Sequence, residues 1–447
     1  MAASASDPEI LSERLIVLAI TSSWWLYLVG GLYIVGPVLG WTLAGLVARA
    51  YFFGDVLPER ERAIRMGWPI MVWLGGMAAM LLILWIGHRN FSLGTGPTIK
   101  SSVGWAKGWA LIALYPLAGA CLAIRPEVIY RAICRLGRQT ICLLPIFLVA
   151  PFAGLPEKLW VSPLKVLGGS GDEYFAFILY TLEPGVGTPR WQFYAPWSPA
   201  AGMIAVIHLL CAIEEKDPKW KAWGIASGIL VALLSQSRLA LVALAVIWPM
   251  AWGVSKLSHA RAWFAAAPAI TLAGWFAPGL IEFANKLQAD FAGARADSTR
   301  VRATLGRIAV ERWQNEAYWF GHGIVEKGPH LVEYMPIGSH HSWYGLLFVK
   351  GITGLLAFAL PMVATLYSTF RVALTRDIGR VGLAMTLVYV LYSFGENMEV
   401  LTYLTWPALL VIGISLRQGK PNEAIGPELA EPEPAEPGQI EPQPQPA

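Results

Sequence analysis

Four arginines are the residues whose chemistry stands out first. Arg190 lies in PRWQFYAPWSP, just before an apolar segment, and Arg238 lies in SQSRLALVAL, between two apolar segments. Arg300 and Arg302 lie in a polar stretch further along the chain. One guanidinium group can bind two oxygen atoms of a phosphate, so several arginines on one side of a protein suit a phosphate or pyrophosphate ligand. Snorkelling to a membrane surface is an alternative explanation of Arg238.

Two adjacent histidines supply a second chemistry. His340 and His341 lie in GSHHSWYGLLFVKGITGLL, directly before an apolar segment. Imidazole is the usual general base near neutral pH, so either ring could accept the proton of a hydroxyl group. A histidine that only caps the following helix is the structural alternative. We expect neighbouring arginines to lower the pKa of His341 and keep its ring neutral, because like charges repel.

An amphipathic helix is predicted over residues 298–320, in the second of two long loops. Its polar residues recur at helical spacing, namely Arg300, Thr304, Arg307 and Glu311. Its apolar residues lie opposite, namely Val301, Leu305 and Ile308. Such a helix is expected to lie near a membrane surface. We expect its arginines to face the centre of the molecule.

The composition predicts that a membrane protein positions these groups. Of the 447 residues, 55% are hydrophobic and 14% are charged, whereas soluble domains carry about 25% charged residues. Apolar segments of about 20 residues are candidates for membrane spans, at about 15–31, 32–53, 68–88, 103–124, 139–155, 198–214, 219–235, 237–254, 262–281, 340–362, 381–395 and 400–416. The expected fold is therefore an all-α polytopic membrane protein over residues 1–419, with about twelve transmembrane helices.

The basic residues predict how this chain is oriented. Lysine and arginine gather in the loops that would share a side with the N-terminus, at 60–65, 125–138, 216–221, 256–261, 371–380 and 417–420. Cytoplasmic loops are enriched in these residues, so both termini are expected to be cytoplasmic. The long loops at 156–197 and 282–339 then lie outside the cytoplasm, together with the arginines and histidines above and the turn that holds Glu396 and Asn397.

The remaining sequence offers little further chemistry. Residues 420–447 are dominated by proline and glutamate and are expected to form a disordered cytoplasmic tail. The four cysteines have no histidine partner at zinc spacing, and no glycine-rich nucleotide-binding motif follows a strand. We expect neither a metal nor a cofactor. A formal charge of +4 is too small to suggest nucleic acid binding.

Together, the motifs resemble one family of membrane enzymes. They are the SR-containing turn at Arg238, the second long loop that ends in WFGHG, and the pattern H-x-W-Y-x-L-L-x-x-x-G that begins at His341. Their order is similar to that of the O-antigen ligase and Wzy-type polymerase superfamily of GT-C-like glycosyltransferases. The resemblance covers about residues 180–355 in motif and the whole chain in topology.

This resemblance implies a reaction and roles for the residues. Members of the superfamily transfer a glycan from undecaprenyl pyrophosphate and need no nucleotide sugar or metal. The family's catalytic histidine falls on His341, followed by Ser342 where the family commonly has asparagine, which leaves His340 as an alternative. The substrate-binding arginines fall on Arg190, Arg238 and either Arg300 or Arg302.

The reaction catalysed and the acceptor are left open. A polymerase of exopolysaccharide or O-antigen repeat units is favoured because such enzymes make up much of the superfamily. A ligase that transfers the glycan to a lipid A core is the alternative. Expected partners are the lipid-linked glycan, its acceptor, the bilayer of a bacterial inner membrane and other polysaccharide-assembly proteins. A lipid-linked glycan flippase is a third reading. It would place ionisable residues at mid-membrane in broken helices, and Lys350 is one such residue.

Overall fold

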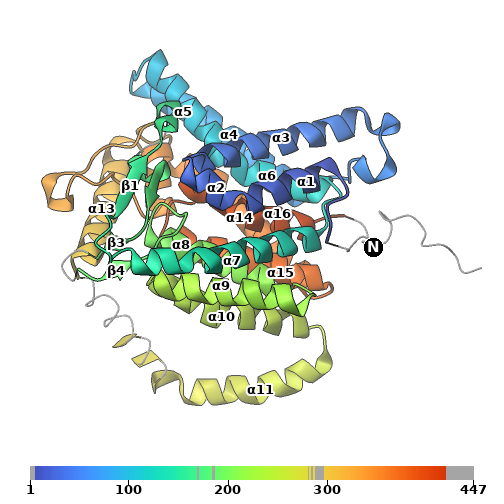
Figure 1. Ribbon diagram of the computed structural model, residues 1–447. Coiled ribbons are helices and arrows are strands. Elements are labelled where there is room, and N and C mark those ends of the chain that lie inside the picture. The colour runs from blue at the N-terminus through green and yellow to red at the C-terminus, as the bar shows by residue number, and fades with distance from the viewer. Residues whose placement is uncertain are drawn as a thin grey trace, which may run out of the picture.

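The protein is a bundle of helices in a computed structural model (Figure 1). The structure describes residues 6–168, 171–183, 187–279, 281–282, 285–286 and 296–418. The predicted tail at 420–447 lies outside these residues. In the described part, the helices are α1 (Leu11–Thr21), α2 (Ser23–Leu28), α3 (Leu32–Phe52), α4 (Trp68–Asn90), α5 (Thr95–Lys107), α6 (Trp109–Cys121), α7 (Pro126–Val149), α8 (Ser198–Ile213), α9 (Pro218–Leu234), α10 (Arg238–Lys256), α11 (Ala260–Trp275), α13 (Ala296–Glu316), α14 (Ser342–Ala373), α15 (Asp377–Ser393) and α16 (Met398–Ser415).

The length and composition of the helices are those of a helical membrane protein. Among the described residues, six helices are long and apolar enough to cross a membrane, namely α3, α4, α7, α10, α14 and α16. A helix lies in each of the twelve predicted segments. Several of them are shorter than a bilayer requires, so a count of twelve spans stays a prediction.

The fold is mostly helical, as expected, with a few short strands. The first long loop contains β1 (Lys158–Val161), β2 (Ala176–Ile178), β3 (Thr181–Leu182) and β4 (Pro189–Arg190), which pair as two antiparallel two-stranded sheets. Trp160 stacks on Phe177 across the first pair, with ring centroids 4.8 Å apart. Cross-strand aromatic pairs of this kind stabilise short strands.

Several helix boundaries differ from the predicted segments, among them two in the first half of the chain. The segment 103–124 is divided at Gly108, so that α5 is largely exposed while every residue of α6 is buried. Helix α7 begins at Pro126 and not near residue 139. In its arginine-rich first half, Arg131 forms a bidentate ion pair with Glu215, with two N–O distances of 2.9 Å. A charge that finds such a partner does not require a solvent-exposed loop.

The centre of the bundle depends on small residues. A methyl group on Gly119 of α6 would lie 2.3 Å from the Leu410 carbonyl oxygen of α16. A methyl group on Gly413 would lie 2.2 Å from the Pro116 carbonyl oxygen. The two backbones therefore touch, as in the close helix pairs of membrane proteins. This packing fixes α16, whose first turn borders the candidate site.

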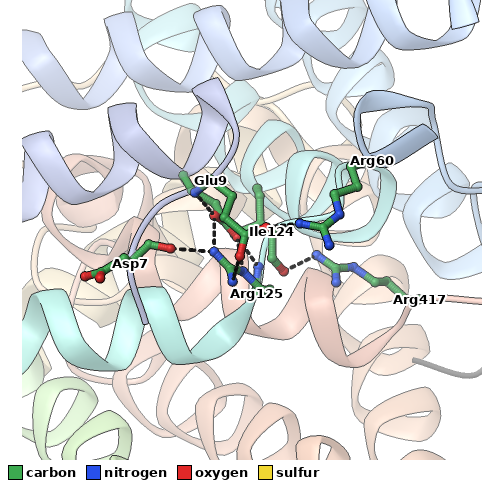
Figure 2. A network of polar contacts seen from close by, with 7 residues as sticks. Asp7, Glu9, Arg60, Ile124, Arg125 and Arg417 are labelled. Carbon is green, nitrogen blue, oxygen red and sulfur yellow. Dashed lines mark hydrogen bonds and ion pairs between the residues drawn. The ribbon is translucent and has the colours of Figure 1, made fainter. Parts of the chain in front are cut away.

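A network of ion pairs ties the N-terminus to the bundle (Figure 2). The Arg125 guanidinium contacts Glu9 at 2.5 Å and Glu13 at 2.8 Å, and it donates to the Asp7 carbonyl at 2.6 Å. Arg417, just after α16, donates at 2.6–2.9 Å to three carbonyl oxygens at the end of α6 and just beyond it. These bonds satisfy carbonyls that a helix end leaves without an intrahelical partner.

The predicted amphipathic helix is confirmed as α13. Val301 and Leu305 are buried against Val332, whereas Arg302 and Arg307 are exposed. Figure 1 places α13 beside the β strands, at the end of the bundle away from the N-terminus. This position puts the arginines of α13 near the starts of α8, α10, α14 and α16, where the other predicted site residues lie.

Candidate functional site

Two chain segments that are far apart in sequence meet where α14 begins. The His341 backbone N–H donates to Asn397 Oδ1 at 3.2 Å. Ser342 Oγ donates to the Glu396 carbonyl at 2.7 Å and accepts from Met398 N at 3.0 Å. The connection between α15 and α16 is therefore fixed to the first turn of α14. This joint holds both predicted histidines beside Glu396 and Asn397.

The predicted loop arginines Arg190 and Arg238 lie at the same end of the bundle. Arg238 is the first residue of α10, and its neighbour Leu239 lies 3.3 Å from where a methyl group on Gly395 would be. Arg190 ends β4, which is tied to the turn between α9 and α10. Gln236 Nε2 donates to Pro189 O at 3.2 Å, and Trp191 N donates to Leu234 O at 3.3 Å.

Arg302 interacts electrostatically with residues of this group. The positive charge of Arg302 acts on the Glu396 carboxyl and on the His340 ring. Arg300 is also exposed, but residues two apart lie on different sides of a helix. Of the two arginines, Arg302 is therefore the one whose charge acts on the joint between α14 and the α15–α16 turn.

His341 serves as the N-cap of α14, which is the structural alternative that the sequence left open. Its Nδ1 accepts from Tyr344 N at 3.3 Å, and its ring stacks on Tyr344 with centroids 4.0 Å apart. A neutral ring that accepts at Nδ1 carries its proton on Nε2. Burial lowers the pKa of His341. The expected cause was repulsion by arginines, whereas desolvation is the cause found.

His340 lies in a different environment from its neighbour. Its backbone has φ of 61°, in the left-handed region that few residues with a side chain adopt. Burial, together with the charge of Arg302, lowers the pKa of His340 to about 4. A ring with this pKa is neutral at physiological pH and is a weak base. The strained backbone turns the chain into α14.

Glu396 is the central acidic residue of the site, whereas the sequence analysis predicted only that its turn lies on the same side as the histidines. Its side chain is 1% exposed, and its Oε2 accepts from Trp197 Nε1 at 2.9 Å. Burial raises the pKa of Glu396 to about 7, although the charge of Arg302 and the bond from Trp197 favour ionisation. The sequence signal was an acid in a four-residue turn between two apolar segments. Its tryptophan partner, 199 residues earlier, had no such signal.

Helix α14 is broken nine residues after its start. Gly351 has φ of 66° and ψ of −166°, which interrupts the helical ladder. The segment 318–323 fills the interruption. His322 N and Gly323 N donate to Phe348 O and Val349 O at 2.9 and 3.0 Å, while Ile352 N donates to Tyr318 O at 3.0 Å. The backbone groups that the break exposes are therefore satisfied by protein, as membrane depth requires.

A cluster of charged groups fixes α13 to this break. Arg312 forms ion pairs with Glu316 at 2.8 Å and Glu326 at 2.6 Å. These bonds lower the pKa of Glu316 to about 2, with the bond from Arg312 the largest cause. His322 Nε2 lies 2.8 Å from Glu316 Oε2, and its Nδ1 lies 3.0 Å from Phe348 O. Both neighbours accept, so both bonds form only when the imidazole carries two protons.

The donor set of the site is cationic and carboxylic. Within the described ranges, no group of three or more His, Cys, Asp or Glu side chains could hold a metal ion. What the arrangement offers is guanidinium groups for an anion, together with one imidazole and one carboxyl for proton transfer. No protein-family model matches the chain, and a search of curated proteins finds no match.

Proposed function

We propose that the protein is a glycosyltransferase that acts on an undecaprenyl-pyrophosphate-linked glycan. The observation that carries the proposal is the meeting of three kinds of group at one end of the bundle. His341 and Glu396 lie at the joint between α14 and the α15–α16 turn. The charge of Arg302 reaches this joint. Arg190 and Arg238 lie on the segments packed beside it.

Each kind of group has a part in glycosyl transfer. The oxygen of an acceptor hydroxyl bonds to the anomeric carbon, and the bond from that carbon to the pyrophosphate oxygen breaks. The hydroxyl proton passes to a base, and the lipid pyrophosphate leaves with its electron pair. Arginines stabilise the negative charge on the leaving group through bidentate hydrogen bonds. These bonds would come from Arg190, Arg238 and Arg302. Arg300 is the alternative to Arg302 on α13.

His341 is the proposed base, and its capping bond sets a condition on this role. While Nδ1 accepts from Tyr344, the neutral ring is a donor at Nε2 and can hold an anionic oxygen. The bond is long, at 3.3 Å, so little free energy is lost when it opens. The released lone pair can then accept the acceptor's proton. Glu396 supplies a negative counter-charge that orients Arg302.

The setting of the reaction is also part of the proposal. The chain would cross a bacterial inner membrane about twelve times, with both termini in the cytoplasm and the site on the periplasmic side. The basic residues at the end of the bundle that holds Arg125, Arg131 and Arg417 favour this orientation. Its partners would be the bilayer, the acceptor and other polysaccharide-assembly proteins.

The acceptor decides between two activities. We favour polymerisation of the repeat units of an exopolysaccharide or O-antigen over ligation to a lipid A core. The test is incubation of the purified protein with an undecaprenyl-pyrophosphate glycan, with and without a lipid A core. A ladder of longer glycans without the core supports the polymerase, and transfer only with the core supports the ligase. If neither product forms, the proposal of an enzyme is wrong.

A flippase for the same lipid-linked glycan is the second candidate, favoured by one observation. Lys350 is buried in α14 directly before the break at Gly351, and transporters use such broken helices for binding. However, the carbonyls at the break already accept from His322 and Gly323, so they are not offered to a transported ion. Movement of a fluorescent lipid-linked glycan across proteoliposomes, without transfer, would favour the flippase.

A further inference from the structure

Lys350 is the buried charge that the proposed mechanism does not use. Its side chain is 4% exposed within a helix long enough to cross a membrane. Its side chain packs against Gly354, where an added methyl group would lie 2.1 Å from Lys350 Cβ. An ionisable residue at such a place is costly and is retained mainly for function.

The opposite charge nearby is Glu399, in the first turn of α16. The charges of Lys350 and Glu399 act on each other. Among the residues that the structure describes, however, no direct ion pair within 4 Å joins them. Glu399 accepts a hydrogen bond from the Trp109 side chain. The two charged groups therefore act on each other at more than contact distance.

A row of aromatic side chains connects this pair to the site at Glu396. We call Tyr33, Tyr174, Tyr403 and Trp197 the aromatic row. The ring centroid of Tyr33 lies 5.0 Å from the centroids of Tyr174 and Tyr403. The centroid of Tyr174 lies 6.2 Å from that of Trp197. Trp197 donates to Glu396. At the other end, Tyr403 follows Glu399 by one helical turn, and the Glu399 charge reaches Tyr33.

The row is not sealed inside the protein. Tyr33, Trp197 and Glu399 are half-buried, whereas Tyr174, Tyr403 and Lys350 are buried. Lys350 and Glu399 also balance each other in charge, and the Glu173 charge reaches Tyr403. The region is therefore neutral to acidic, which does not suit a pyrophosphate. It suits an uncharged ligand that has both hydroxyl groups and apolar faces.

Sugar rings have this chemistry. Their C–H faces pack on aromatic rings, and their hydroxyl groups both donate and accept. A carboxylate accepts only and an ammonium group donates only, so Glu399 and Lys350 can fix different hydroxyls of one sugar. We propose that Lys350, Glu399 and the aromatic row form a binding site for the uncharged sugars of the glycan. This inference rests on the proposed function, and it separates sugar binding from the binding of pyrophosphate by arginines.

The test uses two ligands that each carry one half of the substrate. One is the glycan released by mild acid from the lipid-linked pool of the source cells, and the other is undecaprenyl pyrophosphate without sugar. Affinities are measured by calorimetry on the full chain in nanodiscs. Glu399→Gln and Lys350→Met should each weaken glycan binding at least about tenfold, as expected for loss of a charged hydrogen bond. Both variants should bind undecaprenyl pyrophosphate as the wild type does.

Matched variants keep the result interpretable if a substitution impairs folding. Gly354→Ala leaves every charge in place but displaces the Lys350 side chain, so it should also weaken glycan binding. Arg302→Ala should show the reverse pattern, with weaker undecaprenyl pyrophosphate binding and unchanged glycan binding. The inference is overturned if the wild type does not bind the released glycan, or if the Gln, Met and Ala variants all bind it normally.

The same experiment separates this inference from the proposed function. If glycan binding depends on Lys350 and Glu399 but no transfer product forms, the enzyme proposal fails and the sugar site stands. If transfer occurs while glycan affinity does not depend on either residue, the sugar site is wrong and the enzyme proposal stands. Equal loss of affinity for both ligands in Glu399→Gln would also overturn the sugar site, because it would indicate general damage.

Discussion

Arg125 and Arg417, at one end of the helix bundle, hold their charges differently from Arg302 at the other end. At the end drawn in Figure 2, Arg125 contacts the side chains of Glu9 and Glu13 directly, and Arg417 donates to three backbone carbonyls. At the other end, Arg302 acts on Glu396 and His340 through its charge, and no direct ion pair joins these residues in the described part of the chain.

This difference separates arginines that stabilise the fold, the stabilising charges, from arginines that remain available to a ligand, the working charges. A cation whose donors are all used by protein acceptors cannot bind a substrate without losing those bonds. A cation held near a carboxylate, but not paired with it, keeps its donors for a ligand and still gains from the opposite charge. The comparison predicts that substitution of Arg302 reduces transfer, whereas substitution of Arg125 reduces stability.

The largest effect on transfer is expected at His341. His341→Ala removes both the base and the N-cap of α14, whereas His341→Asn removes the base and keeps a capping side chain. Both variants should lose transfer by about 10² to 10⁴-fold, which is the usual contribution of a general base. The measurement is glycan transfer by each purified variant, together with its thermal unfolding midpoint. Only the Ala variant should be less stable.

His340→Ala is the control for this position. Because the pKa of the His340 ring is about 4 and His340 does not cap α14, its loss should be much milder. A fully active His341→Asn enzyme would show that His341 is a helix cap and nothing more. A His340→Ala enzyme that alone is inactive would move the base to His340.

A smaller but still large effect is expected from Arg302→Ala. Loss of a group that stabilises developing charge commonly costs about 10²-fold in rate. Arg302→Lys should restore part of the activity, because a lysine attracts phosphate but lacks the planar fork. Arg190→Ala and Arg238→Ala should behave in the same way. Arg300→Ala is the matched control, and greater loss there than in Arg302→Ala would reverse the assignment on α13.

Much of the fold is readable from the sequence because it depends on local periodicity. Twelve apolar segments each contain a helix, and the spacing of Val301 and Leu305 predicted α13. What the sequence lacked were contacts between distant segments. The break at Gly351 is stable only because residues 318–323 supply its hydrogen bonds. The bond from Trp197 to Glu396 likewise joins elements with no local pattern in common.

The sequence predicted which residues gather at this end of the bundle, and their roles stay predictions. Arg190, Arg238 and Arg302 lie at the end of the bundle that holds His341, and the side of the membrane on which they lie stays a prediction. The central place of Glu396 could not be read from the sequence. A carboxyl in a turn is ordinarily solvated, and only tertiary packing reveals that this one is buried.

A more moderate effect is expected at Glu396, where it should depend on pH. The unfolded carboxyl ionises near 4.5 and the folded one at about 7. Between these values the folded protein holds a proton that the unfolded chain has released, so stability should fall as the pH rises from 4.5 to 7. Transfer should rise through pH 7, because only the ionised carboxyl orients Arg302.

Glu396→Gln tests both halves of this expectation. The amide does not titrate, so the decrease in thermal midpoint with pH should be smaller than in the wild type. Transfer should be lower by roughly tenfold, the effect of losing one charge-assisted contact, and its rise near pH 7 should disappear. A Gln variant with the wild-type pH profile would assign that profile to another group.

The smallest effect on transfer is expected at the opposite end, from Arg125→Met. The substitution leaves Glu13, which is 1% exposed, without the guanidinium that binds both of its oxygens. A buried carboxylate that loses its partner costs roughly 1–3 kcal/mol of unfolding free energy. Thermal unfolding should therefore shift to lower temperature, and Glu13→Gln in the same chain should recover part of the loss by removing the charge. Transfer per folded molecule should stay at the wild-type level, because Arg125 lies at the far end of the bundle from His341. If Arg125→Met instead reduces transfer per folded molecule as strongly as Arg302→Ala, the two ends are coupled and the division between stabilising and working charges is wrong.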